Sequence, residues 1–389
     1  MSLPLALYLH FPWCVSKCPY CDFNSFALRG ELPEDAYLAA LESDLLHQLE
    51  VYAEALQGRS FDTLFMGGGT PSLFSPRAIA RVIESVRQHH AVSAAAEITL
   101  EANPATVERG RFAEYAAAGI NRVSLGAQSF DRDALRTLGR IHDPDDVRRA
   151  AEELHAAGLA NFNLDLMYGL PGGGCEQAIA DVEQALALQP AQISHYHLTL
   201  EPGTPFAAQP PADLPSDQET ALMLQAALER FSSAGLRQYE VSAYARPGRE
   251  CAHNLIYWQF GDYLGVGAGA HGKVTRSDAR GGALAIERTR HSREPRRYQR
   301  DPQASLVRES VPDEQRPFEF LLNALRLNAG FDLSTFSART GLQSEALEPQ
   351  LSSLATRGLV AVQADRVSAT DLGRQFLNEI LVEFLPPKP

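Results

Sequence analysis

Three cysteines lie within eight positions near the start of the chain, in the stretch HFPWCVSKCPYCDFNS. They are Cys14, Cys18 and Cys21, spaced as C-x3-C-x2-C, and the position two residues after the third is Phe23. Thiols clustered in this way more often bind metal or carry out redox chemistry than form disulfides. A structural zinc ion is one alternative, but it usually takes four ligands in two pairs, and the chain has no second C-x2-C. Three thiolates can also hold three irons of a cubic iron–sulfur cluster and leave the fourth iron open to a chelating small molecule.

Glycine and polar residues follow other strand-like segments farther along the chain. The run MGGGTPS includes Gly68, Gly69 and Thr70, and glycines there would let a ligand approach the backbone and leave N–H groups free. Each such residue alone is typical of a structural position, so the prediction of a shared site depends on their common placement after strands. Carboxylate, amide and guanidinium groups with this placement belong to Glu101, Gln128, Arg140 and Asp165, and a guanidinium group suits a carboxylate or a ribose.

To bring these residues together, the chain must place the ends of several strands side by side. Six consecutive strand–helix units predict an α/β fold with a parallel sheet and right-handed crossovers. Because a barrel carries its site at the carboxyl ends of its strands, we predict a partial (β/α)6, TIM-like barrel in residues 1–235. The strands are expected at 5–11, 61–66, 97–103, 121–129, 161–171 and 192–203, and the helices at 35–56, 75–86, before Gly119, and at 143–158, 175–188 and 216–235.

The remainder of the chain has a different character. Residues 236–312 are expected to be a connecting segment with the motif HNLIYW, a pocket-lining strand at GVGAGAHG, and an arginine-rich loop with six arginines between 288 and 300. For this loop the pattern favours solvent exposure over a partner-docking patch. Residues 313–389 have the helix and strand order of a small winged-helix-like domain. Its ten acidic and seven basic residues, a net charge of −3, argue against DNA binding.

Composition limits the function further. The net charge of −13 disfavours non-specific nucleic-acid binding, and 45% hydrophobic residues are ordinary for a soluble globular protein. No apolar run is long enough to span a bilayer, and the N-terminus has neither a basic region nor a cleavage site of the kind found in signal peptides. We therefore expect a cytoplasmic protein, and a peripheral position at a membrane is compatible with the sequence.

The cysteine stretch CVSKCPYC after the first strand resembles the signature of the radical S-adenosylmethionine (SAM) family. The resemblance implies a [4Fe–4S] cluster on Cys14, Cys18 and Cys21, with the amino and carboxylate groups of SAM on the open iron. It also implies that the glycine run holds the methionine amino group and that Glu101 binds the SAM ribose. The other positions that resemble cofactor-contacting residues of the family are Tyr8, Tyr20, Gly68, Gly69, Thr70, Gln128, Arg140 and Asp165.

Within that family, nearly the whole chain resembles the oxygen-independent coproporphyrinogen III oxidase group. This group has an oxidase branch and a heme-chaperone branch. The oxidase branch resembles the pattern C-x3-C-x2-C-x-C and has a longer extension before its cysteines. In the present chain the position of the fourth cysteine is Phe23, and only thirteen residues precede Cys14. The stretch HNLIYW matches the H-N-x-x-Y-W motif of the chaperone branch. These departures favour the chaperone branch.

The H-N-x-x-Y-W resemblance implies that His253 binds heme. A neutral imidazole is a good axial ligand for heme iron, and Tyr257 and Trp258 could stack on a flat macrocycle. From the residues alone, a core histidine beside buried aromatic side chains is the stronger interpretation. Other candidate heme ligands are His10, His195, His197 and His271, and Cys251 is a candidate for reaction with a heme vinyl group.

The resemblance therefore implies a protein that binds heme, a [4Fe–4S] cluster and SAM, and transfers heme to an apo heme-protein acceptor of respiration. A transient membrane-protein partner and a homodimer are both left open. Whether SAM is cleaved, and so whether the chain is an enzyme, is also left open. The first rival interpretation is the oxidase, which decarboxylates coproporphyrinogen III to protoporphyrinogen IX. The second is a winged-helix regulator that senses iron or heme.

Overall fold

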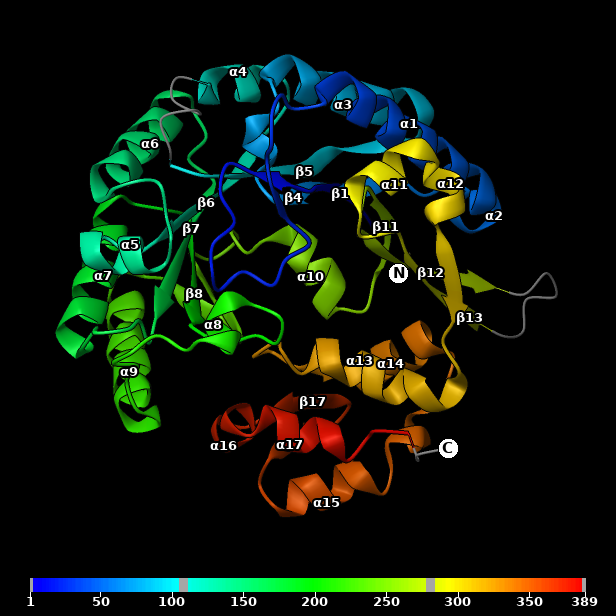
Figure 1. The fold of residues 1–389 in the computed structure, drawn as a ribbon. Helices are drawn as coiled ribbons and strands as arrows, with labels where there is room; N and C mark the ends of the chain where they lie inside the picture. The colour runs from blue at the N-terminus through cyan, green and yellow to red at the C-terminus, as the bar shows by residue number, and fades with distance from the viewer. Residues whose placement is uncertain (1–2, 105–110, 278–283, 387–389) are drawn as a thin grey trace.

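The computed structural model describes residues 3–104, 111–277 and 284–386. Its main feature is one twelve-stranded sheet, which curves around a central space (Figure 1). The strand order in this sheet is β14-β13-β12-β11-β1-β4-β5-β6-β7-β8-β10-β9.

The six expected parallel strands form the middle of the sheet and are neighbours in chain order. This arrangement places their carboxyl ends at one rim, as predicted from the alternation of strands and helices. The strands are β1 (Leu5–Phe11), β4 (Phe61–Gly68), β5 (Val92–Ala102), β6 (Arg122–Gln128), β7 (Phe162–Tyr168) and β8 (Gln192–His197).

The segment 236–312 is not merely a connection, because it extends both edges of the same sheet. One edge gains β10 (Ala243–Ala245) and β9 (Arg237–Glu240), which are antiparallel. The other gains β11 (Asp262–Val266), which pairs in parallel with β1. Beyond β11 follow three antiparallel strands, β12 (His271–Ser277), β13 (Leu284–Arg290) and β14 (Val307–Ser310).

The arginine-rich stretch differs from the expected loop. Its first part is the end of β13, and its second part is the helix α11 (Pro295–Arg300), followed by α12 (Pro302–Ser305). Pro295 and Tyr298 are buried, so one side of α11 packs on the protein. The sequence did not indicate this helix, because six residues are too few to show a clear helical repeat of apolar positions.

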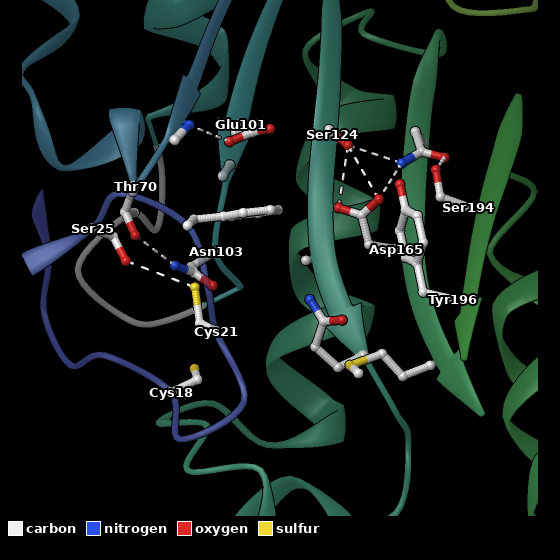
Figure 2. Close-up of a pocket in the computed structure, with 18 of the residues that line it drawn as sticks. Cys18, Cys21, Ser25, Thr70, Glu101, Asn103, Ser124, Asp165, Ser194 and Tyr196 are labelled. Atoms are coloured by element: carbon white, nitrogen blue, oxygen red, sulfur yellow. Dashed lines mark hydrogen bonds between the residues drawn. The ribbon is translucent and has the colours of Figure 1, made fainter. Parts of the chain in front are cut away.

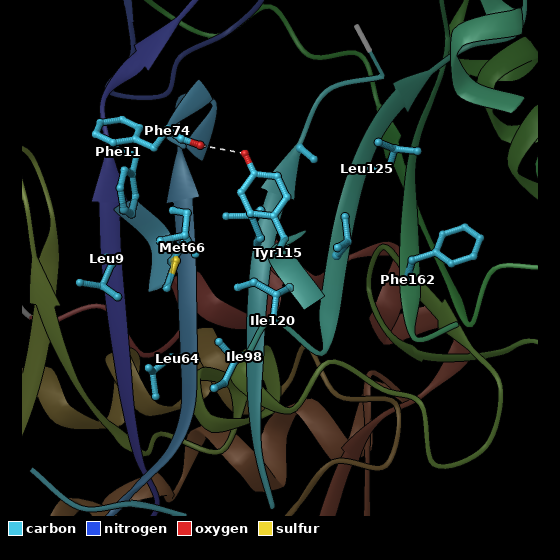
Figure 3. Packing of buried hydrophobic residues seen from close by; sticks show 14 of the residues in the cluster. Leu9, Phe11, Leu64, Met66, Phe74, Ile98, Tyr115, Ile120, Leu125 and Phe162 are labelled. Carbon is cyan, nitrogen blue, oxygen red and sulfur yellow. Dashed lines mark hydrogen bonds between the residues drawn. The ribbon is translucent and has the colours of Figure 1, made fainter. Parts of the chain in front are cut away.

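Helices cover the convex side of the sheet (Figure 1) and enclose the main core. Alternate residues of each strand point outward to this core, and Figure 3 shows Leu9, Leu64, Ile98 and Leu125 doing so from four neighbouring strands. Two expected helix starts are present: Ser75 caps α3, and Ser216 forms a capping box with Glu219. The covering helices are α1 (Glu34–Val51), α2 (Ala53–Leu56), α3 (Pro76–His89), α4 (Phe112–Ala117), α5 (Arg132–Thr137), α6 (Pro144–Ala156), α7 (Cys175–Ala187) and α9 (Asp217–Ser233).

One helix lies on the concave side. The helix α10 (Ala252–Trp258), which carries the HNLIYW motif, occupies the space inside the curve of the sheet (Figure 1). Its His253 hydrogen-bonds to Thr63 at the beginning of β4. The helix therefore sits toward the amino ends of the strands, opposite the rim where the cysteines lie.

The last part of the chain folds around a second core. Helices and a three-stranded sheet in the order β15-β17-β16 match the expected winged-helix-like order. Phe260 packs edge-on against Phe320, and Arg326 forms an ion pair with Glu240, so this domain is docked on the barrel. Its elements are α13 (Arg316–Ala324), β15 (Phe331–Asp332), α14 (Leu333–Thr340), α15 (Gln350–Thr356), β16 (Val360–Gln363), β17 (Arg366–Ala369), α16 (Asp371–Gln375) and α17 (Leu377–Val382).

Within the described ranges, none of the helices combines the length and the apolar character that crossing a bilayer requires.

Candidate functional site

A cavity of about 540 Å³ opens inside the curve of the sheet. Its volume is typical of a site for a small organic ligand. The structure brings all the predicted site residues to its wall: Tyr8, Cys14, Cys18, Tyr20, Cys21, Gly68, Gly69, Thr70, Glu101, Gln128, Arg140, Asp165 and His253. In contrast, the stretch GVGAGAHG (265–272), expected to line the pocket, contributes none of the lining residues.

The cysteine loop, defined here as residues 15–25, leaves the carboxyl end of β1 and crosses the mouth of the cavity. A short parallel pair, β2 (Trp13–Cys14) with β3 (Phe26–Ala27), closes its base. Within the loop, the Cys21 amide donates to the Cys18 carbonyl at 3.1 Å. Cys18 and Cys21 point into the cavity in Figure 2, and burial raises the pKa of the Cys14 and Cys21 thiols. Uptake of a metal centre would therefore release protons from these thiols.

The donor set fits an iron–sulfur cluster better than a single ion. Among the described residues, no three histidine, cysteine or acidic side chains are grouped closely enough to hold one metal ion. A cubic cluster takes one thiolate per iron, so its cysteines need not converge on one point. The three thiols of Cys14, Cys18 and Cys21 face one cavity, and these residues would hold the cluster.

Arg140 ties the cysteine loop to the ends of two strands. Its guanidinium donates to Cys18 Sγ at 3.7 Å, to the Gly126 carbonyl at 2.8 Å and to Asn103 Oδ1. Asn103 in turn donates to Thr70 Oγ1 at 2.9 Å. A positive charge held at this place suits either a sulfur-bound anionic cluster or a ligand carboxylate.

The glycine run is required by the chain's own packing. A Cβ atom at Gly68, where φ is +110°, would lie 2.2 Å from the His10 ring. A Cβ atom at Gly69 would lie 2.6 Å from the Trp13 carbonyl oxygen. Both positions therefore accept only glycine, because His10 of β1 and Trp13 of β2 fill the space that a side chain would need.

Glu101 stands where β5 ends and faces the glycine run. Its carboxylate accepts a 2.9 Å hydrogen bond from the Gly68 amide. Burial raises the pKa of Glu101 to about 8, with this hydrogen bond opposing the shift and Asp165 adding to it. The carboxyl group is therefore mostly protonated near neutral pH, and it can act as a donor as well as an acceptor toward a hydroxylated ligand.

Asp165 lies in a group of polar side chains on the neighbouring strands (Figure 2). It accepts hydrogen bonds from Ser124 at 3.3 Å and from Asn163 at 2.7 Å. Burial raises its pKa to about 6, although these hydrogen bonds oppose the shift. Sequence reasoning missed Ser124, Asn163, Ser194 and Tyr196, which also line the cavity. The alternation along β6, β7 and β8 was the available signal for all four.

Gln128 lines the cavity next to an irregularity in the sheet. The pairing of β6 with β7 shifts register between Gly126 and Gln128, and Gln128 has a φ of +67°. A non-glycine residue in this region is strained, and such strain is often found at functional positions. Ser124, Gly126 and Gln128 all line the cavity, so the alternation of β6 continues to its end, and the fully buried Ala127 belongs to the core on the other face.

Tyr8 and His10 run along the inner face of β1. Tyr8 Oη lies 2.9 Å from His10 Nδ1, and His10 Nε2 lies 2.9 Å from the Asn24 carbonyl oxygen. Since a carbonyl only accepts, His10 carries its proton on Nε2, and Tyr8 donates to Nδ1. Burial lowers the pKa of His10 to about 4, so this ring stays neutral and joins β1 to the cysteine loop.

His253 lines the cavity but is only 1% exposed. Both ring nitrogens are engaged: Nδ1 lies 2.7 Å from Thr63 Oγ1, and Nε2 lies 2.8 Å from Tyr257 Oη. Burial lowers its pKa to about 3, so the imidazole is neutral, as an iron ligand must be. To bind iron, however, one of its nitrogens must first give up its present partner.

The other candidate ligands are divided by the structure. Only His197 shares the cavity wall with His253, and it is exposed. His195 packs outside the cavity between Tyr168 and Phe231. His271 and His10 are likewise absent from the wall. Cys251 reaches the wall but is 2% exposed, and burial raises its pKa to about 12, so its thiol is a poor nucleophile.

Comparison with known proteins gives consistent matches over the whole chain. Residues 8–185 match the radical SAM superfamily, and residues 311–376 match the HemN C-terminal domain. The heme chaperone HemW of Escherichia coli is 46% identical over 98% of each chain, and HemW of Haemophilus influenzae is 43% identical over the same shares. The solved structure of coproporphyrinogen III oxidase (HemN) from Escherichia coli, a radical SAM enzyme, is 26% identical with a TM-score of 0.81. This match covers 98% of the present chain and 90% of the oxidase chain.

Proposed function

The chain belongs to the HemW family of heme chaperones within the radical SAM superfamily, and from this premise we propose that it binds heme and delivers it to heme-dependent acceptor proteins. In this proposal Cys14, Cys18 and Cys21 would hold a [4Fe–4S] cluster, and SAM would bind in the same cavity. When bound and reduced, such a cluster would supply the one electron that splits SAM into methionine and a 5′-deoxyadenosyl radical.

The observation that carries this proposal is the position of Phe23. The oxidase signature has a further cysteine there, whereas the side chain of Phe23 is 60% exposed in the cysteine loop. Similarity to HemW over 98% of the chain agrees with the chaperone assignment. An apolar side chain at the cavity mouth offers a contact for a flat macrocycle.

The chain's own residues have separate tasks in this proposal. Glu101, Asp165 and Arg140 orient SAM through hydrogen bonds in a buried, polar wall. His253 is the proposed heme ligand. One of its two hydrogen bonds, to Thr63 or to Tyr257, has to open before iron binds, so heme binding is coupled to a rearrangement of these side chains.

The test uses anaerobically reconstituted protein in two parallel assays. We expect stoichiometric heme binding with transfer to an apo-acceptor, and no conversion of coproporphyrinogen III. His253→Ala should weaken heme binding at least tenfold, whereas the matched variant His195→Ala, outside the cavity, should leave it unchanged. Unaltered heme binding in His253→Ala would remove this residue as the ligand.

The oxidase remains the second candidate function, because the HemN structure matches 98% of this chain. It predicts anaerobic conversion of coproporphyrinogen III to protoporphyrinogen IX at a rate that depends on SAM. Conversion with multiple turnovers in the same assay would support the oxidase and contradict the chaperone proposal.

A further inference from the structure

The arginine-rich stretch presents a cationic face that the fold leaves unused. Two of its six arginines have acidic partners: Arg288 lies 2.5 Å from Glu319, and Arg290 lies 2.9 Å from Glu309. For the other four, no ion pair is found in the part of the chain that the structure describes. These are Arg293, Arg296, Arg297 and Arg300, and all four are exposed.

Three of these arginines lie on α11, and Arg293 comes directly before its N-cap residue, Glu294. Positions 296, 297 and 300 are i, i+1 and i+4, so these three side chains share one side of the short helix. The opposite side is fixed to the protein, since Pro295 and Tyr298 are buried and Tyr298 Oη donates to Asp44 Oδ2 at 2.7 Å. We call Arg293, Arg296, Arg297 and Arg300 the arginine face.

The arginine face lies directly beside the cysteine loop. Arg293 Nε donates to Asn24 Oδ1 at 3.3 Å, and Asn24 Nδ2 donates to the carbonyls of Arg293 at 3.0 Å and of Ala268 at 2.9 Å. Asn24 comes three residues after Cys21. A protein docked on the arginine face would therefore stand next to the metal centre and not at a remote surface.

The charges of this region also act on a neighbouring histidine. Burial lowers the pKa of His271, and the charges of Arg288, Arg290 and Arg293 lower it further. The whole chain carries a net charge of −13, so most of its surface repels an acidic protein. A cationic face on such a molecule attracts an acidic partner and also orients it.

We propose that the arginine face is the docking surface for an acidic one-electron carrier protein that reduces the cluster. This inference rests on the proposed function for its electron-transfer step, because that step, unlike docking itself, requires the cluster on the three cysteines. In the step, the reduced carrier loses one electron, the cluster goes from the 2+ to the 1+ state, and no bond is made or broken.

The test compares two charge reversals of equal size. The variant R296E/R297E/R300E inverts the arginine face without touching Arg293, whose contact holds Asn24. The control R237E/R246E/R249E inverts three exposed arginines at or next to the opposite sheet edge. Both variants change the net charge by six units, from −13 to −19. The probe is a reduced flavodoxin with an acidic surface.

We expect the flavodoxin affinity of R296E/R297E/R300E to fall at least tenfold at low ionic strength, and that of the control to change less than twofold. Added salt should weaken binding to the unmodified chain and have little effect on the first variant. Equal losses in both variants, or no loss in either, would overturn the proposal. If the glutamate variant does not fold, R296Q/R297Q/R300Q should still lose affinity, and unchanged affinity there would also overturn it.

Two further measurements separate this inference from the proposed function. Cluster reduction by flavodoxin should slow in R296E/R297E/R300E, while reduction by photoreduced deazaflavin should not, which localises the defect to docking. Equal slowing with both reductants would count against docking. Iron and sulfide analysis tests the cluster itself: a chain that takes up no cluster contradicts the proposed function, whereas salt-sensitive flavodoxin binding by that chain still supports the docking surface.

Discussion

The two ends of the barrel interior differ in how firmly the protein's own hydrogen bonds engage their candidate ligand residues. At the mouth, the cysteine loop has no regular secondary structure, and its thiols face the cavity. At the floor, α10 is helical, and both nitrogens of His253 already have partners. Along β4, the floor residue Thr63 and the mouth residue Gly68 are five residues apart, or roughly 16 Å at the usual rise per residue.

This difference indicates how each end binds its ligand. The mouth offers thiols on a loop that is anchored at both limbs. The contacts of Cys18 with Arg140 and of Cys21 with Ser25 are long sulfur hydrogen bonds of 3.7 Å, so a ligand there displaces only weak protein contacts. The floor offers a satisfied histidine, so a ligand there must compete with Thr63 and Tyr257. Binding at the mouth should therefore be fast and direct, and binding at the floor should require a conformational change.

The largest expected effect comes from replacing a cysteine at the mouth, compared with replacing one at the floor. Cys14→Ala removes one of three thiols at the mouth, and we expect loss of the brown cluster chromophore after reconstitution. Cys251→Ala, at the floor, is the control and should retain it. The measurement is iron and sulfide content with the visible absorption spectrum. A normal cluster in Cys14→Ala would refute the ligand set.

The next effect concerns how firmly the mouth is held. Asn24→Ala removes the side-chain hydrogen bonds to Ala268 and Arg293 and leaves their carbonyls unpaired. We expect amide hydrogen exchange in residues 15–25 of the metal-free chain to accelerate roughly tenfold. Asn328→Ala loses a comparable bond to the Gln238 carbonyl, far from the loop, and serves as the control. Equal exchange in both variants would show that the loop does not depend on Asn24.

A smaller effect is expected at the floor. Tyr257→Phe removes the partner of His253 Nε2, so this nitrogen becomes free for iron without a competing bond. Heme affinity should rise by about threefold, the worth of a modest net hydrogen bond. Tyr263→Phe, which loses a contact with Arg288 instead, should leave heme affinity unchanged. Weaker heme binding in Tyr257→Phe would mean that the phenol itself contributes to the site.

The smallest expected effect concerns the ionisation of Glu101 in the cavity wall. The folded-state pKa of Glu101 is raised from 4.5 to about 8, so its stabilising contribution is complete below pH 4.5 and is lost as pH rises through 8. Glu101→Gln stays neutral, and the metal-free variant should therefore melt about 2 °C above the unmodified chain at pH 8.5. At pH 5 the two should agree, and Glu84→Gln, on the exposed side of α3, should show no such pH dependence. Parallel melting curves across this range would contradict the raised pKa.

The sequence was most informative where function depends on residues close in the chain. The cysteine spacing, the glycine run and the strand-end positions of Glu101 and Asp165 all rest on local patterns, and each of these residues lines the cavity. The alternation of strands and helices predicted the parallel centre of the sheet for the same reason.

The parts that could not be predicted depend on contacts between distant residues. Nothing near Asp262 indicates that β11 pairs in parallel with β1, because that pairing joins positions more than 250 residues apart. The inward position of α10 and the partners of Arg288 and Asn24 could not be predicted for the same reason, because they depend on residues far away in the chain. Ser194 and Tyr196 were missed for a different reason: in the same strand they alternate with His195 and His197, and the expectation of a heme ligand favoured the histidines.

The pairing of β1 with β11 also has a consequence for how the protein is made. The strand that leads into the cysteines, β1, is synthesised more than 250 residues before β11, its neighbour on one side, and before Ala268, whose carbonyl anchors Asn24. At typical elongation rates this interval lasts on the order of ten to fifty seconds. During that time the three thiols are on a ribosome-bound chain whose loop has no anchor on this side. Insertion of a metal centre into a finished loop is therefore expected to be a late event in biogenesis, after Ala268 has emerged from the ribosome.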